Sequence, residues 1–488
     1  MKLEDDLSMG SKTTTNSTIY PKFYWKTKMT FTARKNSSSI PIIPVTKADF
    51  EKQKNPAANT KNKWFEKVGF SAEPGTVCYV PETKDCSLEI FLGVESSDEP
   101  GGGIWDLAGL PKLLTKGRYH LNKDLSPSAA TRACIGWGLG TYIFNKYKKQ
   151  NKTTAELVWP VGADKKDVIR IIDGISLTRD LINTPANDMG PDDLVKSSKK
   201  LAKNHKAQIT IISGLDLLRK NYPSIHAVGR ASVSKPSLID IKWGDPKAPK
   251  VTLVGKGVCF DSGGLDIKPA SGMLNMKKDM GGAAQVLGLA HIIMDANLPI
   301  RLRVLIPAVE NAISGNAFRP RDVLQTRKGL TVEVGNTDAE GRLILSDALT
   351  EATRDKPSMI IDFATLTGAA RIAMGTDVPA LFCNNDELAG SLLQYGMETE
   401  DPLWRLPLWQ GYKPMLKSNV ADLSSTGSTP YGGAITAALF LEHFVEASIP
   451  WAHIDLMSYN NTSRPGRPEG GEAQGIRAIY HMLKDRFN

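Results

Sequence analysis

The stretch VTLVGKGVCFDSGGLDIKPASGMLNMKKDMGGAA, from Val251 to Ala284, decides the fold of this chain together with VGNTDAEGRLILSDAL, from Val334 to Leu349. Both stretches place glycine-rich turns between apolar runs. Carboxylate oxygens suit hard divalent cations, and unpaired buried charge is costly. The charged residues in these turns therefore favour a metal site; they are Lys256, Asp261, Lys268, Asp279, Asp338, Glu340 and Arg342.

The same residues allow a plainer interpretation. An Asp after a strand is often a helix cap or a turn residue, so Asp338 and Asp279 would each begin the helix that follows. Lys277 and Lys278 would then be ordinary surface lysines. Capping does not explain why these turns are so rich in glycine, which lets the backbone approach a ligand closely. On residue types alone, both interpretations stay open.

Apolar strands alternate with helices around these two stretches. Continuous apolar strands between helices predict an α/β fold with a mostly parallel sheet covered by helices on both faces. Polar groups in such sheets gather at the carboxyl ends of the strands. We predict strands at 209–212, 238–243, 251–260, 302–307, 330–334, 359–363 and 451–456, and helices at 281–294, 343–354 and 435–445.

The N-terminal part predicts a second, smaller α/β domain. Strands are expected at 40–45, 76–81, 88–94 and 155–161, and a helix at 128–149. We expect residues 1–38, rich in Ser, Thr, Asn and Lys, to be a flexible extension. The smaller domain then covers 39–162, a connecting helix covers 163–184, and the larger C-terminal domain, which holds the candidate metal site, covers 185–488.

Composition indicates a globular protein of a reducing compartment. Of the 488 residues, 41% are hydrophobic and 23% are charged. The cysteines are scattered and form no CxxC pair, which argues against a disulfide scaffold and a Cys-rich zinc site. No signal-peptide core and no apolar run of about 18 residues is present, so we expect a cytoplasmic protein without a membrane partner. The cysteines are Cys78, Cys86, Cys134, Cys259 and Cys383.

The positive charge is concentrated at the N-terminal end. The net charge is +9, and residues 1–65 contribute +7 of it, with twelve Lys and Arg against five Asp and Glu. The remaining residues carry only +2, which argues against a large basic groove for nucleic acid. A nucleic-acid-binding or regulatory protein on the same scaffold remains the alternative function.

Other catalytic motifs are missing from the sequence. The histidines never form HExxH, so a His-based zinc site of that kind is not expected. No GxxxxGK[ST] pattern surrounds Lys256, which excludes a phosphate-binding loop there. Ser262 lacks the GxSxG setting of a nucleophile elbow.

The octapeptide NTDAEGRL, at 336–343, and VGKGVCFDSGGLDIKP, at 254–269, resemble the leucyl (cytosol) aminopeptidase family of dinuclear-metal exopeptidases. The resemblance covers roughly residues 150–488 and includes NTPAN at 183–187, ATLTGA at 364–369, ADLSSTG at 421–427 and WAHID at 451–455. It implies a metal-dependent aminopeptidase that releases N-terminal amino acids from peptides. It also implies a homo-hexamer, with assembly through the N-terminal domain.

The resemblance assigns metal ligands residue by residue. Asp261 and Glu340 would bridge two divalent ions, zinc or manganese. Lys256 and Asp279 would complete one site, and Asp338 the other. As a ligand Lys256 must be neutral, a state that burial and neighbouring cations favour.

The resemblance also assigns catalytic and substrate-binding residues. Lys268 would stabilise the tetrahedral intermediate, and Arg342 would hold a bicarbonate that acts as general base. After WAHID the family commonly has Ala-Gly, where this chain has Leu456-Met457-Ser458, and the resemblance places Met457 near the pocket for the first side chain. We therefore expect a reshaped pocket, for which leucine need not be the best first residue. The plainer alternative makes Met457 a core residue. The substrate-binding residues implied are Thr365, Leu366, Gly368, Met276 and Met457.

Overall fold

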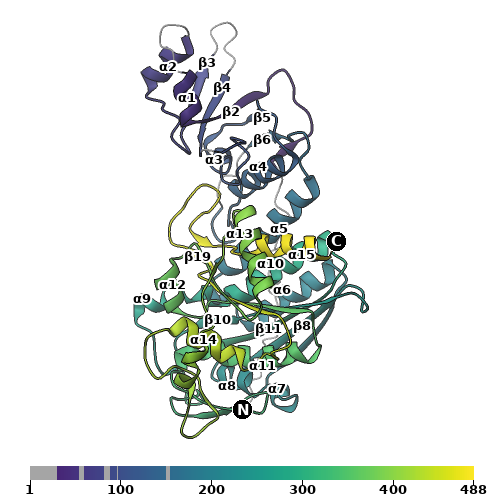
Figure 1. The fold of residues 1–488 in the computed structure, drawn as a ribbon, viewed down its shortest axis with the longest axis vertical. Coiled ribbons are helices and arrows are strands. Elements are labelled where there is room, and N and C mark those ends of the chain that lie inside the picture. The colour runs from purple at the N-terminus through teal and green to yellow at the C-terminus, as the bar shows by residue number, and fades with distance from the viewer. Residues whose placement is uncertain (1–29, 54–59, 82–87, 96, 150–153, 488) are drawn as a thin grey trace, which may run out of the picture.

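A computed structural model of the chain describes residues 30–53, 60–81, 88–95, 97–149 and 154–487. Figure 1 shows a smaller N-terminal domain above a larger C-terminal domain, with helix α5 (Lys165–Asn183) lying where the two meet. Both domains combine a mixed sheet with helices, so the predicted two-domain α/β architecture is confirmed. Most of the predicted N-terminal extension, residues 1–29, falls outside the described residues.

The N-terminal domain is built on a six-stranded sheet with the order β1-β6-β5-β2-β4-β3. Neighbouring strands pair parallel except at the edge, where β3 runs antiparallel to β4. The strands are β1 (Phe31–Thr32), β2 (Ile40–Thr46), β3 (Val77–Pro81), β4 (Leu88–Val94), β5 (Gly117–Leu121) and β6 (Ala155–Val158). The helices are α1 (Lys47–Gln53), α2 (Thr60–Val68), α3 (Leu110–Leu113) and α4 (Pro127–Gly140).

The helix predicted at 128–149 is wrong in its second half, because α4 ends at Gly140. A Cβ at Gly140 would lie 2.1 Å from the carbonyl oxygen of Ala108, and one at Gly136 would lie 1.7 Å from that of Ile104. These glycines let a neighbouring loop pack directly on the helix, and each lowers helix propensity. The Thr141 N–H closes the helix on the carbonyls of Gly138 and Leu139.

The C-terminal domain contains a nine-stranded sheet with the order β16-β15-β18-β14-β9-β11-β8-β7, and β10 pairs with β11 beside it. Strands β18, β14, β9, β11 and β10 are parallel where they pair, as the sequence predicts. Toward the edges, β8, β7 and β15 pair antiparallel. The strands are β7 (Gln208–Ser213), β8 (Ser237–Trp243), β9 (Lys250–Gly255), β10 (Gly257–Asp261), β11 (Arg301–Asn311), β14 (Met359–Ala364), β15 (Ala380–Cys383), β16 (Trp404–Arg405) and β18 (Trp451–Asp455).

The single strand predicted at 251–260 is two strands in the structure. β9 pairs with β14 and β11, whereas β10 pairs with β11 alone. Lys256 lies at the break between them, where its N–H donates to the carbonyl oxygen of Phe363 and its own carbonyl accepts from the N–H of Ala283. The break leaves a charged side chain in the middle of an apolar segment.

Helices cover both faces of the large sheet, and alternate strand residues point to opposite hydrophobic clusters. Val304 and Ile306 belong to the cluster that contains residues of α5, α10 and α15, and Leu305 belongs to the cluster with α8, α11 and α14. The main helices of this domain are α6 (Pro191–Asn204), α8 (Pro223–Gly229), α10 (Gly281–Ala296), α11 (Glu340–Arg354), α12 (Gly368–Met374), α13 (Asp386–Glu398), α14 (Gly433–Glu442) and α15 (Ile476–Phe487). The remaining short elements are α7 (Asp216–Arg219), α9 (Ala270–Met273), η1 (Ala186–Asp188), η2 (Met276–Met280), η3 (Thr337–Ala339), η4 (Gln410–Leu416), β12 (Val323–Gln325), β13 (Thr331–Glu333), β17 (Leu423–Ser424), β19 (Tyr459–Asn460) and β20 (Gly470–Gly471).

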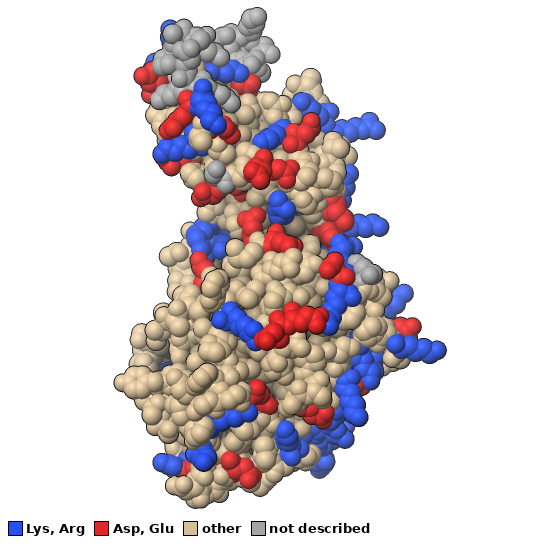
Figure 2. All heavy atoms as spheres, in the orientation of Figure 1, with Lys and Arg blue, Asp and Glu red and all other residues tan. Residues whose placement is uncertain are grey.

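The surface carries charges of both signs. On the face in Figure 2, Lys and Arg side chains are interspersed with Asp and Glu side chains over both domains. Within the described ranges, none of the helices has the length and apolar character needed to cross a bilayer.

Candidate metal centre

The residues that the sequence singles out come from several elements of the C-terminal domain. Lys256 lies between β9 and β10, and Asp261 ends β10. Asp279 belongs to the 3-10 helix η2, Asp338 to η3, and Glu340 is the first residue of α11. Strand ends and helix starts thus bring two distant parts of the chain to one place.

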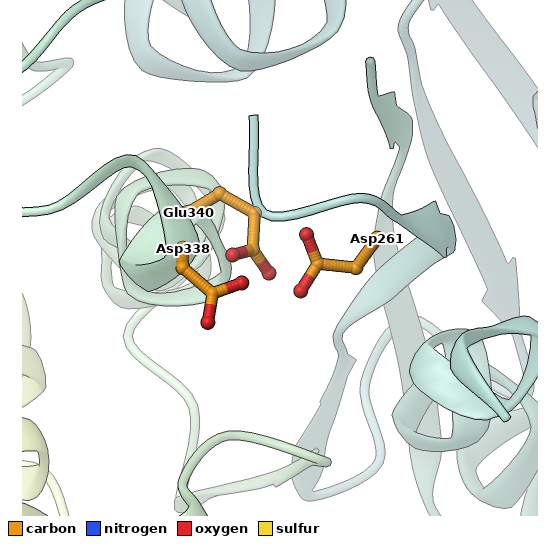
Figure 3. Close-up of side chains that lie close together, drawn as sticks. All are labelled: Asp261, Asp338 and Glu340. Carbon is orange, nitrogen blue, oxygen red and sulfur yellow. The ribbon is translucent and has the colours of Figure 1, made fainter. Parts of the chain in front are cut away.

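Three carboxylates form the centre of the site. One oxygen each of Asp261, Asp338 and Glu340 lies within 4.8 Å of the other two, and their side chains point toward one another (Figure 3). Asp261 and Glu340 are buried and Asp338 is half-buried. This crowding of oxygen ligands is the arrangement that divalent cations bind.

Burial and mutual repulsion make these carboxylates hard to ionise. Burial, with the nearby charge of Asp261, raises the pKa of Glu340 to about 8. The same two causes raise the pKa of Asp338 to about 6, against the opposing effect of Lys268. Groups whose charge is this unfavourable need a compensating positive charge close by.

Two lysines supply positive charge inside the site. The Nζ of Lys256 lies 2.8 Å from Asp279 Oδ2 and 3.0 Å from Glu340 Oε1, and it donates to the Thr365 carbonyl at 3.0 Å. The Nζ of Lys268 lies 2.9 Å from Asp261 Oδ2 and also contacts Asp338. Without cations, the centre is therefore a network of internal ion pairs.

This network bears on the neutral Lys256 that the family resemblance implies. Burial alone would lower its pKa, but the carboxylates of Asp279, Glu340 and Asp261 outweigh burial and raise the pKa above its usual value. Lys256 is thus an ammonium group among carboxylates when no cation is near, and only cations beside it could reverse the balance.

Neighbouring residues fix the carboxylates by hydrogen bonds. Asn311 Nδ2 donates to Asp261 Oδ1 at 2.8 Å, and Thr365 Oγ1 donates to Asp279 Oδ1 at 2.7 Å. Thr337 Oγ1 donates to the Gly263 carbonyl at 2.6 Å and holds the turn after β10. Sequence reasoning missed Asn311, whose only signal is its place as a polar residue at the end of a long apolar strand.

Glycine is required where α11 passes Lys256. A Cβ at Gly341 would lie 2.5 Å from Lys256 Cε and 2.7 Å from its Nζ. A Cβ at Gly282 would likewise lie 2.1 Å from the Phe363 carbonyl oxygen. A larger residue at Gly282 would collide with backbone, and one at Gly341 would force the Lys256 side chain to shift, so these glycines set how closely the helices approach the site.

A cavity of about 370 Å³ opens over the centre. Most of the predicted site residues line it, namely Lys256, Asp261, Lys268, Met276, Asp279, Asp338, Arg342, Thr365, Leu366 and Gly368. Glu340 lies beneath the surface, with 1% of its area exposed. Met457 is half-buried and lies outside this lining, so the structure does not bring it together with the other substrate-binding candidates.

Arg342 is buried beside the centre. Its Nη1 donates to the Ser425 carbonyl at 2.6 Å, whereas its Nε is buried with no hydrogen-bond partner among the described residues. Burial lowers the pKa of the guanidinium to about 10, against the opposing charges of Glu340 and Asp455. The unpaired Nε leaves a donor for an anion in the cavity.

Two further residues of the site escaped the sequence reasoning. Asp455, in WAHID, accepts from the backbone N–H groups of Leu366 and Thr367, at 2.9 and 3.2 Å, and from Thr367 Oγ1 at 2.6 Å. It thereby holds the loop that carries the predicted substrate contacts. Lys278, interpreted as a possible surface lysine, is 1% exposed and lines the cavity, so that interpretation is wrong.

Comparisons with known proteins place this geometry in a family. The catalytic-domain model of the cytosol aminopeptidase family matches residues 176–480, and the "M17 aminopeptidase, N-terminal domain" model matches residues 40–160. A probable cytosol aminopeptidase of Roseiflexus castenholzii is 41% identical over 384 residues, which is 75% of this chain and 78% of the relative. One of Clostridium perfringens is 37% identical over 459 residues, 88% of this chain and 93% of the relative.

Solved structures agree with the sequence relatives. The crystal structure of cytosol aminopeptidase from Coxiella burnetii matches with a TM-score of 0.89 and 49% identity, over 94% of this chain and 99% of that one. The bottromycin maturation enzyme BotP in complex with Mn matches with a TM-score of 0.83 and 30% identity, over 93% of this chain and 100% of that one. The chain therefore belongs to the cytosol aminopeptidase family and is a metal-dependent aminopeptidase.

Proposed function

We propose that two divalent cations bind at this centre and that the chain uses them to release N-terminal amino acids from peptides. Asp261 and Glu340 would bridge the ions, Lys256 and Asp279 would complete one site, and Asp338 the other. The observation that carries the proposal is the group of three carboxylates within 4.8 Å of one another. Neither oxygen of Glu340 has a hydrogen-bond partner among the described residues, and Lys256 lies 3.0 Å from Oε1 outside hydrogen-bonding geometry.

When bound, the two cations would anchor the substrate's free α-amine, polarise the scissile carbonyl and lower the pKa of water at the site. The chain's own residues would stabilise the intermediate and hold the general base. Lys268 faces the same cavity and would stabilise the oxyanion of the tetrahedral intermediate with its ammonium group. Arg342 would hold a bicarbonate as general base through its unpaired Nε, since a planar guanidinium suits a planar anion.

The loop after β14 would bind the peptide backbone. Thr365, Leu366 and Gly368 line the cavity, and Asp455 fixes the loop from behind. Met276 lines the cavity where the first side chain would lie. Met457 is half-buried and does not line the cavity, so it would shape the pocket for the first side chain only indirectly. Rates on leucyl, alanyl and methionyl substrates for wild type and Met457→Ala test this, and an unchanged ranking of the three would contradict it.

We further propose a homo-hexamer assembled through the N-terminal domain, working in the cytoplasm with zinc or manganese. The complex of BotP with Mn favours manganese as the first ion to try. Oxygen-rich ligand sets accept either metal. The mass in solution, measured by light scattering, tests the assembly.

The decisive experiment measures amino acids released from the N-terminus of unblocked tripeptides. A chelator should abolish release, and readdition of manganese or zinc should restore it. The same peptides with an acetylated N-terminus are the matched control and should stay intact. Release that persists after complete metal removal, or equal cleavage of the acetylated peptides, would overturn the proposal.

A further inference from the structure

Lys278 is a buried lysine whose side chain has no role in the site as described so far. It lies in η2, directly before Asp279, with 1% of its surface exposed, and it lines the cavity over the metal centre. Its Nζ has no hydrogen-bond partner in the part of the chain that the structure describes. A buried ammonium without a partner is among the most unfavourable groups in a protein interior.

The acidic groups nearest to Lys278 are already engaged. The Asp279 carboxylate receives the Lys256 ammonium at 2.8 Å and the Thr365 hydroxyl at 2.7 Å. The Asp455 carboxylate receives the two backbone N–H groups and the hydroxyl of the loop after β14. Arg371 of α12 lines the same cavity and adds a second positive charge. This part of the cavity therefore has a surplus of positive charge.

A ligand that carries a carboxylate would compensate this surplus of positive charge. Lys278 stands next to Asp279, a candidate metal ligand near which the scissile bond would lie, and both residues line the same cavity. A group bound at Lys278 is thus close to the first residue of a substrate. The terminal carboxylate of a peptide of three or more residues lies further along the chain, so the anion that reaches Lys278 belongs to the first side chain.

We propose that Lys278 makes this aminopeptidase select peptides whose first residue carries a side-chain carboxylate, glutamate or aspartate. The proposal rests on the proposed two-metal function and specifies its substrate class. A charged hydrogen bond inside a buried pocket discriminates strongly against an analogue that lacks the charge, because the buried group is then left unpaired.

The test compares tripeptides that differ only in the first residue: Glu-Ala-Ala, the isosteric Gln-Ala-Ala, and Leu-Ala-Ala. For the metal-loaded full-length enzyme, kcat/KM should be at least about 10-fold higher for the Glu than for the Gln peptide. In Lys278→Met and Lys278→Gln this ratio should fall to about 1. Lys277→Met is the matched control, because Lys277 does not line the cavity and donates instead to the Asn183 carbonyl at 2.9 Å; it should keep the wild-type ratio.

The outcomes separate this inference from the function on which it rests. If wild type cleaves the Leu peptide but its kcat/KM is equal for the Glu and Gln peptides, the proposed selectivity is wrong and the proposed aminopeptidase function still holds. An unchanged ratio in the Lys278 variants also overturns it. If no first residue is released from any of the peptides, the proposed function is wrong.

A second measurement needs no variant. Free L-glutamate and L-glutamine should compete with the Leu peptide on wild type, and glutamate should inhibit at a concentration at least about 10-fold lower. Equal inhibition by the two amino acids would refute the role of Lys278, even if its substitutions fail to fold.

Discussion

Substituting Gly341 with alanine should weaken metal binding without removing any ligand. The new methyl carbon would lie 2.5 Å from Lys256 Cε, and ordinary contact begins at 3.4 Å, so the Lys256 chain must move by 0.9 Å. Metal sites tolerate deviations of only about 0.2 Å in ligand distance. Disturbing a residue that orients a metal site typically costs about 10–100-fold in affinity, and we expect a loss in that range.

The assay is equilibrium dialysis of manganese and zinc against the purified protein, with metal content read by mass spectrometry. Gly390→Ala is the matched control, since Gly390 also lies in a helix, α13, and a Cβ there would meet nothing within 4 Å. Alanine is favoured over glycine in helices by up to about 1 kcal/mol, so a folded Gly341→Ala protein with weakened binding isolates the steric effect. Wild-type affinity in Gly341→Ala would refute the role given to Lys256.

Three further outcomes are expected. Burial lowers the pKa of His291 to about 4, below its value of 6.5 in the unfolded chain. The free energy of unfolding should therefore decrease by up to about 3 kcal/mol as the pH falls from 6.5 to about 4. Urea unfolding across this range should show a smaller decrease in His291→Gln than in wild type. Glu472→Gln should destabilise the fold by about 3–5 kcal/mol, because it removes the negative charge 2.9 Å from the buried Arg179 guanidinium. Asp216→Asn at an exposed pair should change stability by less than about 1 kcal/mol in the same denaturant titration. Manganese at 100 times its dissociation constant should raise the free energy of unfolding by about 2.7 kcal/mol for each site it fills, and thermal scans should show most of this gain lost in Asp261→Asn.

The sequence predicts the central part of the fold well because its signals are local. β9, β14 and β18 are mostly apolar runs, and α10 begins with a glycine pair, so the type and the position of these elements can be predicted from the sequence. The helix expected past Gly140 fails because its end is set by loop packing on glycines, a tertiary effect. The helices α13 and α15 escaped the sequence reasoning although α15 repeats Ile476, Ile479, Tyr480 and Leu483 at helical spacing.

The residues of the candidate site also differ in how well the sequence predicts them, depending on whether their signal is local. The carboxylates of Asp261 and Glu340 stand in short motifs, so residue type and spacing point to them. Asn311 and Asp455 support the site from strands far away in the sequence, where a single polar residue carries no local signal. The burial of Lys278 is likewise invisible in the sequence, since a lysine beside an aspartate is usually on the surface.

The lysines inside the candidate metal centre also set how much negative charge the pocket carries. Lys256 and Lys268 place an ammonium nitrogen 2.8 to 3.0 Å from Asp279, Glu340 and Asp261, but these two lysines are outnumbered by the four carboxylates of the site, which include Asp338. Because two ammonium groups offset only part of the charge of four carboxylates, the pocket keeps a residual negative charge that favours cations.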